Sequence, residues 1–383
     1  MTERVRADVA IVGGGIAGCA AAVALRAAGM TVVLLEKQLC GAGASGVNFG
    51  GVRQQGRDLA ELPLARRARA IWEGLNERVS DDVEFVASGH LKLARSDADM
   101  AQLEAYAAAA AEFGLRLELL GRDAVRKSAP WVGPGVVGGS LCAEDGHANP
   151  RVVGPAYARL ARRMGADVRE HAEVASAARA DDGFVTTTAQ LEVRSRFLVN
   201  CAGVAAGTIA GWFGERAPVR PIVPNMVVTE PLPFLVDRSL GVCGGGVYLR
   251  QIARGNVIFG GGDGWADAEC RRSRPLTRTT LGAMREALAL VPALEGCHVI
   301  RTWTGIDGEM PDVIPVIGFS STTPDLVHAF GFSGHGFQLG PVMGEIVAEL
   351  VTQGRSASPL EPFAIERFIE PAVAPGTAVA TEP

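Results

Sequence analysis

The first 36 residues alternate between apolar runs and short glycine-rich turns. Residues 9–12 are continuously apolar, which is typical of a strand buried on both faces of a sheet. An Ala-rich segment from about residue 16 to residue 28 has helical spacing, and Gly29 ends it. Residues 31–36 form a second apolar run. This order predicts a strand, a helix and a parallel strand, the beginning of a sheet covered by helices.

The rest of the chain alternates between helical segments and short strands. Helical spacing occurs at residues 64–79, 97–113, 151–164, 277–291 and 342–351. We expect Asp97 and Thr277 to cap two of these helices, because short polar side chains accept hydrogen bonds from a helix's first N–H groups. Strand-like segments occur at residues 89–94, 173–180, 184–188, 190–193 and 196–203, with a hairpin turn at 253–256 between 247–252 and 257–260. Residues 131–147 are rich in Gly and Pro and are expected to be an irregular connection.

This order predicts an α/β chain with two interleaved domains. We expect a nucleotide-binding domain from residues 1–83, 146–215 and 302–370. An α+β substrate domain with an antiparallel sheet is expected from residues 84–145 and 216–301. The Ala-, Pro- and Thr-rich tail at 371–383 is expected to be disordered. A chain of 383 residues is long enough for both domains.

Composition and charge narrow the classes of partner. The net charge of −5 gives no reason to expect nucleic acid or an anionic membrane surface as a partner. The seven cysteines include no C-x-x-C pair, so neither a disulfide framework nor a metal site is expected. The sequence shows no signal peptide and no apolar run of about 18 residues. We therefore expect a cytoplasmic protein and leave peripheral attachment to the inner membrane open.

The turn after the first strand carries a dinucleotide-binding pattern. Gly13, Gly15 and Gly18 form G-x-G-x-x-G directly between the strand and the helix. The first glycine allows a tight turn, the second lets a pyrophosphate approach the backbone, and the third lets helix and strand pack closely. The first helical N–H groups then point at the phosphates. Glu36 ends the second strand at the spacing expected for a carboxylate that binds the adenosine ribose.

Four separated segments together resemble one flavoprotein family. They are the 13–18 turn with Glu36, residues 44–46, residues 198–203, and residues 312–318 with 331–341. The family contains glycine oxidase, sarcosine oxidase, D-amino acid dehydrogenases and the β subunits of dye-linked proline and opine dehydrogenases, and the fourth segment is most similar to those β subunits. The resemblance implies a glutathione-reductase-type flavoprotein, in which a Rossmann-like FAD-binding domain is interleaved with the substrate domain.

The resemblance and the glycine pattern together indicate the cofactor-binding residues. These are Gly13, Gly15, Ile16, Ala17, Gly18, Glu36, Lys37, Ala44, Ser45, Gly46, Val174, Cys201, Ala202, Gly203, Gly334, His335, Gly336, Phe337 and Gln338. The glycine-rich segment 331–341 permits a backbone that presses against a flat ring, and Pro341 suits the first turn of the next helix. The N-terminus of that helix would stabilise an anionic reduced flavin. No cysteine follows Cys297, so we expect FAD to be bound noncovalently.

The family's chemistry is oxidation of the C–N bond of a small amino acid, imino acid or N-substituted amino acid. A hydride passes to the flavin, and the resulting imine hydrolyses. A substrate carboxylate would need an arginine. In glycine and D-amino acid oxidases that arginine follows a Trp-x-Gly, but here the segment reads Trp303-Thr-Gly-Ile-Asp307. Arg53, which matches an arginine of sarcosine oxidases and proline dehydrogenase β subunits, and Arg250 are the two replacement candidates.

Four other side chains are candidates for the substrate pocket. We expect His335 beside the flavin or the substrate, with bonding of the loop backbone as its alternative role. Tyr248 and Trp303 either wall the pocket or belong to the ordinary core. Asp307 either recognises a cationic group or is a solvated loop acid.

Alternatives remain open for both the reaction and the electron acceptor. The same scaffold suits flavin-dependent oxidation of a CH–OH group of the 2-hydroxy acid type, and the chain could be a subunit of a heteromeric opine or proline dehydrogenase. A lysine near the flavin assists oxygen reduction in monomeric sarcosine oxidases. Here Lys37, Lys92 and Lys127 are the only lysines, and none lies in the C-terminal half. We therefore expect electrons to pass to a quinone or a partner protein rather than to O2, although backbone and arginine contacts would also permit an oxidase.

Overall fold

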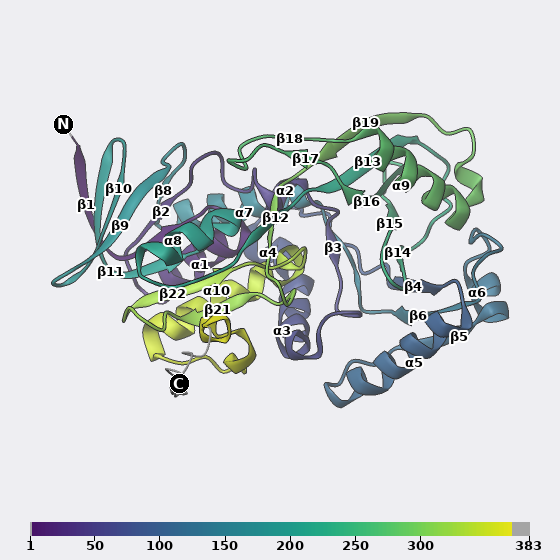
Figure 1. The fold of residues 1–383 in the computed structure, drawn as a ribbon, viewed down its shortest axis with the longest axis horizontal. Helices are drawn as coiled ribbons and strands as arrows, with labels where there is room; N and C mark the ends of the chain where they lie inside the picture. The colour runs from purple at the N-terminus through teal and green to yellow at the C-terminus, as the bar shows by residue number, and fades with distance from the viewer. Residues whose placement is uncertain (1, 370–383) are drawn as a thin grey trace, which may run out of the picture.

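Two eight-stranded sheets lie toward opposite ends of the longest axis of the molecule (Figure 1). A computed structural model describes residues 2–369, and the tail expected to be disordered at 371–383 lies outside the described residues. Helices cover both sheets, so the chain has the mixed α/β fold class that the sequence predicts. Within residues 2–369, no helix has both the length and the apolar character needed to cross a membrane.

The first sheet is built mainly from parallel strands. Its path runs β21-β22-β11-β1-β2-β8, and β10 and β9 extend it from β11. The strands are β1 (Glu3–Val12), β2 (Val32–Leu35), β8 (Asp167–Arg169), β9 (Val174–Ala180), β10 (Gly183–Thr188), β11 (Leu191–Asn200), β21 (Val316–Phe319) and β22 (Leu326–Phe330). β1 pairs in parallel with both β2 and β11, which confirms the expected strand, helix and parallel strand. The separate strands expected at 190–193 and 196–203 are wrong, because Ser195 continues β11 through its pairing with Ala7.

The first sheet is covered by helices that pack closely on one another. The helices of the chain are α1 (Ile16–Ala27), α2 (Ala44–Val47), α3 (Leu62–Glu73), α4 (Leu75–Val79), α5 (Asp97–Glu112), α6 (Arg122–Ser128), α7 (Pro150–Arg163), α8 (Ala206–Trp212), α9 (Thr277–Leu290) and α10 (Gly336–Gln353). α1 packs against both α7 and α10. A Cβ on Gly344 would lie 2.5 Å from the carbonyl oxygen of Ala20, so the glycine lets α10 approach the α1 backbone. This contact places the N-termini of α1 and α10 near each other.

The second sheet is antiparallel except for one pair. Its order is β19-β13-β16-β15-β14-β4-β6-β5, and only β4 and β14 pair in parallel. The strands are β4 (His90–Ala94), β5 (Glu118–Gly121), β6 (Gly138–Cys142), β13 (Pro224–Pro231), β14 (Ser239–Val242), β15 (Tyr248–Gln251), β16 (Asn256–Asp263) and β19 (Val299–Thr304). The expected hairpin is present as β15 and β16. β19 crosses the domain boundary expected near residue 302.

Short two-stranded pairs connect the segments around the two sheets. They are β3 (Gly51–Val52) with β7 (Gly146–His147), β12 (Arg220–Ile222) with β20 (Asp307–Glu309), and β17 (Trp265–Ala266) with β18 (Ser273–Arg274). Short 3-10 turns lie at Leu59–Glu61, Gly203–Ala205, Pro292–Leu294, Glu361–Phe363 and Ile365–Phe368. The β3–β7 pair holds the segment that leads from α2 to Arg53.

Several local predictions were wrong. The irregular connection expected at 131–147 contains β6, where Gly138 and Gly139 are needed because a Cβ on either would press against a neighbouring strand's carbonyl oxygen. Gly74 divides the helix expected at 64–79 into α3 and α4.

The expected helix caps were also wrong. Ser96, one residue before Asp97, is the N-cap of α5, and its Oγ accepts from the N–H of Asp99. The N-cap of α9 is the residue before Thr277, and its side chain makes no capping hydrogen bond. Thr277 is therefore the first residue of the helix and not its cap. α10 begins at Gly336, so Pro341 lies inside the helix and not in its first turn. The non-helical part of the glycine-rich segment 331–341 is therefore shorter than expected, because it ends where α10 begins.

Candidate active site

One large cavity extends from the 13–18 turn of the first sheet to the strands of the second sheet. Its volume is 630 Å³, within the range of small-molecule and cofactor sites. The sequence-predicted residues that line it are Gly13, Gly15, Ile16, Ala17, Glu36, Lys37, Ala44, Ser45, Arg53, Cys201, Ala202, Gly203, Tyr248, Asp307, Gly334, Gly336 and Phe337. Segments far apart in the chain thus meet at one cavity.

The three glycines of the turn have separate physical roles. Gly13 has φ +106°, and a Cβ there would overlap the carbonyl oxygen of Cys201. A Cβ on Gly18 would overlap the carbonyl oxygen of Gly13, which confirms that Gly18 permits close packing. Gly15 is different, because its Cβ would meet only Ser45 Oγ, at 3.1 Å. Gly15 therefore keeps the backbone open toward the cavity.

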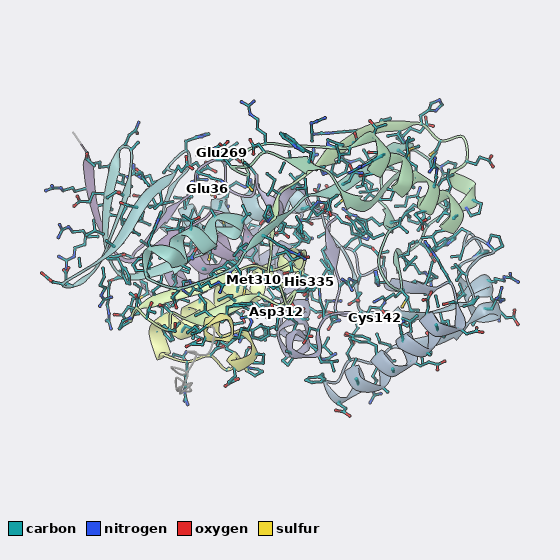
Figure 2. All side chains as sticks on the ribbon, in the orientation of Figure 1. Glu36, Cys142, Glu269, Met310, Asp312 and His335 are labelled. Atoms are coloured by element: carbon teal, nitrogen blue, oxygen red, sulfur yellow. The ribbon has the colours of Figure 1, made fainter. Side chains whose placement is uncertain are left out.

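Glu36 lines the cavity beside the turn, and Figure 2 shows it on the side of the first sheet. Its carboxylate accepts hydrogen bonds from the backbone N–H groups of Gly14, at 2.6 Å, and Gln38, at 2.7 Å. Ser45 Oγ accepts from the N–H of Ile16 at 2.9 Å, which ties the segment at α2 to the first residue of α1. These bonds fix the acid and the helix N-terminus along one wall.

The residues of this wall fit FAD. The open Gly15 backbone and the N-terminus of α1 are suited to a pyrophosphate, and Glu36 is suited to ribose hydroxyls. The N-terminus of α10, reached through Gly334 and Gly336, supplies a second set of N–H donors at the same cavity. Asp307 accepts from the N–H groups of Gly308, at 2.8 Å, and Gly334, at 3.0 Å, so it orders the loop before α10.

Five residues expected to contact the cofactor do not line this cavity. Gly18 and Gly46 are packing glycines, since a Cβ on Gly46 would overlap the carbonyl oxygen of Gly41. Gln338 is buried and donates to the carbonyl of Ala65 at 2.7 Å. Val174 is partly buried against the core of the first sheet, and His335 lines a neighbouring cavity instead.

Four basic side chains converge at the end of the cavity nearest the second sheet. They are Arg53, Arg57, His90 and Lys92. A Cβ on Gly56 would lie 2.8 Å from both Arg53 Nη1 and Lys92 Nζ, so these two groups flank the same glycine. Arg57 donates from Nε to the carbonyl of Arg53 at 3.0 Å. Lys92 comes from the N-terminal half of the chain, so the absence of lysines from the C-terminal half does not keep an ammonium group out of the cavity.

Sequence reasoning missed Arg57, His90 and Lys92. The available signal was the alternation in β4, where Leu91 and Leu93 enter the core of the second sheet. His90 and Lys92 therefore share the opposite face of the strand. Two polar residues on one face of a short buried strand indicate a cavity.

Burial sets the protonation of this cluster. It lowers the pKa of Arg57 to about 9, with a further contribution from the charge of Arg53, and it also lowers the pKa values of Arg53 and Lys92. The pKa of His90 falls well below its usual range because of burial and the three neighbouring cations. Arg53 and Arg57 remain guanidinium cations at neutral pH, and the lowered pKa of His90 favours its neutral imidazole.

His335 lies beside this cluster, near the centre of the molecule (Figure 2). Its Nδ1 is 2.9 Å from Glu61 Oε2, and the Glu61 side chain is fully buried. Burial and the charge of Arg57 lower the pKa of His335 to about 4, although Glu61 opposes this shift. The neutral imidazole donates from Nδ1 to Glu61, which leaves Nε2 as an acceptor. His335 lines a second cavity of 480 Å³, which shares Gly56, Arg57 and Lys92 with the first.

Arg250 does not line either cavity. Its guanidinium lies over the ring of Phe49, with the guanidinium carbon 5.3 Å from the ring centroid, and the residue is 3% exposed. Burial lowers its pKa to about 10.

Tyr248 does line the main cavity and packs edge-on against Phe49, with the ring centroids 4.9 Å apart. Burial raises the pKa of Tyr248, so its phenol is neutral. Trp303 donates to the carbonyl of Val47 at 2.8 Å and lies outside the cavity lining.

Two thiols reach the cavity. Cys201 and Cys270 line it, Cys201 lies against Gly13 of the turn, and burial raises the pKa of Cys201 to about 12. Within residues 2–369, no group of three or more His, Cys, Asp or Glu side chains is arranged to hold a metal ion.

Comparisons with known proteins match almost the whole chain. Residues 8–350 match the DAO family, described as FAD dependent oxidoreductase. The B subunit of opine oxidase from Rhizobium meliloti is 28% identical over 94% of this chain and 97% of that protein. The beta subunit of sarcosine oxidase from Rhizobium meliloti (strain 1021) is 29% identical over 94% of this chain and 88% of that protein. The crystal structure of L-proline dehydrogenase from P. horikoshii has a TM-score of 0.88 and 27% identity, covering 96% of this chain and 98% of that one.

Proposed function

This chain belongs to the DAO family of FAD-dependent oxidoreductases, and from that premise we propose that it oxidises the C–N bond of a small amino or imino acid. Relatives named opine oxidase, sarcosine oxidase and glycine oxidase support the substrate class. Bound FAD would accept the hydride, with its two electrons, that leaves the carbon bearing nitrogen. The imine product then hydrolyses in water. Glu36, Ser45 and the open Gly15 backbone would hold the dinucleotide end, and the N-terminus of α10 the other end.

The observation that carries the substrate proposal is the position of Arg53. Its side chain lines the cavity, its Nη1 donates to the carbonyl of Gln55, and within residues 2–369 it forms no ion pair with a carboxylate. A planar guanidinium in a water-poor cavity is suited to bidentate binding of a substrate carboxylate. Arg250 is not proposed as the clamp, because its head group packs over Phe49 outside the cavity.

The same charges favour the reactive form of the amine. A positive potential from Arg53, Arg57 and Lys92 disfavours an ammonium ion nearby and lowers the pKa of a bound amine. The neutral amine has the lone pair that the oxidation needs. Neutral His335 and neutral Tyr248 add no charge that would oppose this effect.

The electron acceptor is part of the proposal. The lysine count favoured a quinone or a partner protein, but that reason does not hold once Lys92 lines the cavity. O2 therefore stands beside quinone and partner protein as an acceptor. Stopped-flow reoxidation in air, compared with reoxidation by a phenazine or quinone, distinguishes them.

A heteromeric assembly is a second part of the proposal. Two relatives are named as subunits, one of opine oxidase and one of sarcosine oxidase. We infer that this chain holds its own catalytic centre, since the cavity is lined on both sides by this chain. A dye-linked assay of the isolated chain, with its size measured in solution, tests this. Activity that appears only with a second subunit would contradict it.

The proposed reaction is tested with matched substrates. Turnover of sarcosine, proline and glycine with an artificial dye is compared with turnover of glycolate and lactate, which carry a hydroxyl in place of the amine. We expect turnover with the amines alone. Turnover confined to the hydroxy acids would assign the chain to CH–OH oxidation.

A further inference from the structure

We propose that the cavity has a second anion-binding subsite, formed by Arg57 and Lys92 beside Arg53, and that the substrate carries two carboxylates. This inference rests on the proposed oxidation of an amino or imino acid and specifies its substrate class. One carboxylate is bound by Arg53, and the other occupies the place where the two cavities meet.

The first support is the number of cations. A single substrate carboxylate needs one guanidinium, but two guanidinium groups and one lysine line the same end of the cavity. Arg53 Nη1 and Lys92 Nζ flank Gly56, and Arg57 lies between the two cavities. Like charges at this separation repel one another in a water-poor site. A second bound anion offsets this repulsion.

The second support is the position of Arg57. It is 4% exposed, and its side chain lines both cavities. Its Nε donates to the carbonyl of Arg53, and among residues 2–369 its guanidinium forms no ion pair with a carboxylate. Nη1 has no hydrogen-bond partner among the described residues, but it is closed off from both cavities. A buried guanidinium without a counterion is costly to the folded protein, and an anion where the cavities meet would offset that cost through its charge.

The acids near the cluster are already engaged. Glu61 is hydrogen-bonded to His335, and Asp145 accepts from the N–H groups of Gln54 and Gln55. Neither acid lines a cavity. Their negative charges partly offset the positive charge of the cluster. Because they do not line either cavity, the side of the cluster that faces the cavities stays positive.

The second cavity provides the space. Its 480 Å³ adjoin the first cavity at the shared residues Gly56, Arg57 and Lys92. Two acids also line it, but Asp312 is paired with Arg367 at 2.7 Å and Asp58 caps the turn at Ala60. A substituent that extends past Arg53 therefore reaches a positively charged passage. An uncharged substituent would leave the charge of Arg57 without a counterion.

The test compares probes that differ by one carboxylate. Iminodiacetate against sarcosine adds the carboxylate on nitrogen, and glutamate against 2-aminobutyrate adds it on the side chain. Glutarate also differs from butyrate by one carboxylate, and neither compound has an amine that could react. The binding of each to the holoenzyme is measured through the change in the visible absorbance of the flavin. We expect the dicarboxylate to be preferred by about tenfold or more in kcat/KM in at least one amine pair, and in Kd for the unreactive pair.

Variants assign the preference to the cluster. Lys92→Met and Arg57→Met should each reduce the dicarboxylate preference by about tenfold, because each removes one buried charge. Lys92→Arg should retain it. Lys127→Met is the matched control, because Lys127 is exposed on α6 outside both cavities, and it should leave the preference unchanged.

Failure of this inference and failure of the proposed reaction give different results. Equal kcat/KM within both amine pairs and equal affinity for glutarate and butyrate would overturn the second subsite. A preference that survives in both Lys92→Met and Arg57→Met would overturn it as well. If no amine reduces the flavin, the proposed reaction fails, while tighter binding of glutarate that depends on Lys92 still supports the subsite.

Discussion

The imidazole of His335, the residue before α10, donates a hydrogen bond to the buried carboxylate of Glu61, which ends the turn before α3. The two atoms are 2.9 Å apart, and they tie two segments separated by 274 residues. Since His335 is neutral, the bond is charge-assisted from the carboxylate side alone. The alternative role expected for His335 was bonding of the loop backbone, but its imidazole bonds the Glu61 side chain of another segment.

Removing this carboxylate should destabilise the protein. Glu61→Ala leaves the His335 N–H without its acceptor, and we expect the free energy of unfolding to fall by about 2 kcal/mol. Glu61→Gln should cost less, since the amide oxygen can still accept. Glu104→Ala on the exposed face of α5 is the control and should change stability by less than about 0.5 kcal/mol. Denaturant titration of the holoprotein measures all three. Equal stability of Glu61→Ala and the control would contradict the structural role.

Substitutions of Gly15 and Gly18 in the turn should fail in different ways. Gly15→Ala is tolerated by the fold, because Gly15 has φ −68° and its Cβ would meet only Ser45 Oγ. The added methyl faces the cavity, so FAD affinity should fall by about tenfold or more. Gly18→Ala should instead impair folding, since its Cβ would overlap the carbonyl of Gly13. Circular dichroism and flavin absorbance of the purified variants separate the two effects. A yellow Gly15→Ala protein with undiminished FAD affinity would argue against this site.

FAD should be released by acid or heat. Of the two thiols that line the cavity, Cys201 lies against Gly13 of the 13–18 turn, and burial raises its pKa and keeps it protonated. The segment 331–341 before and within α10 contains no cysteine. We therefore expect the flavin in the supernatant after precipitation of the protein, with the mass of intact FAD. Flavin that remains in the pellet would show a covalent link.

Arg53 and Arg250 should behave differently toward substrate. Arg53→Met removes a charge-assisted bond to the substrate carboxylate, so KM should rise about 30-fold or more. Arg250→Met should change KM by less than about threefold, because Arg250 packs over Phe49 outside the cavity. Steady-state kinetics on one amino acid substrate compare the two variants. The opposite order of effects would return Arg250 to the clamp position.

Acid should destabilise the fold through His147. Burial and the charge of Arg250 lower the pKa of His147 to about 3 in the folded protein, below the value of about 6.5 in an unfolded chain. Between pH 6.5 and 3 the unfolded state therefore binds one more proton at this site, and stability falls as the pH falls. His147→Gln should flatten the slope by at most about 1.4 kcal/mol per pH unit. Denaturant titrations between pH 4.5 and 7.5 measure it, and an unchanged slope would contradict the assigned pKa.

Sequence patterns were sufficient where the determinants are local. The 13–18 turn depends on glycines at fixed spacing, and Gly13 and Gly18 are required by backbone contacts that the motif already implies. The resemblance of four segments gave the family, which the match over residues 8–350 confirms. The assignment of residues to the two domains and the detailed set of cofactor contacts stay predictions.

The cationic end of the cavity could not be predicted in the same way. Lys92 reaches it because β4 pairs with β6 and β14 in a register that turns one strand face toward the first sheet. Arg57 reaches it because the segment after β3 bends back at Gly56, which has φ +71°. Counting lysines by their place in the sequence missed this, since the cavity receives side chains from both halves of the chain.

The central claim is that this FAD-dependent oxidoreductase takes its electrons from a C–N bond. Anaerobic titration of the yellow holoenzyme with an amino or imino acid, followed at the visible flavin band, measures this directly. We predict that the band is lost with about one equivalent of substrate, and that an acyclic amino acid yields its carbonyl product and the released amine in equal amounts. A flavin that stays oxidised with every amine but is bleached by a 2-hydroxy acid would contradict the claim.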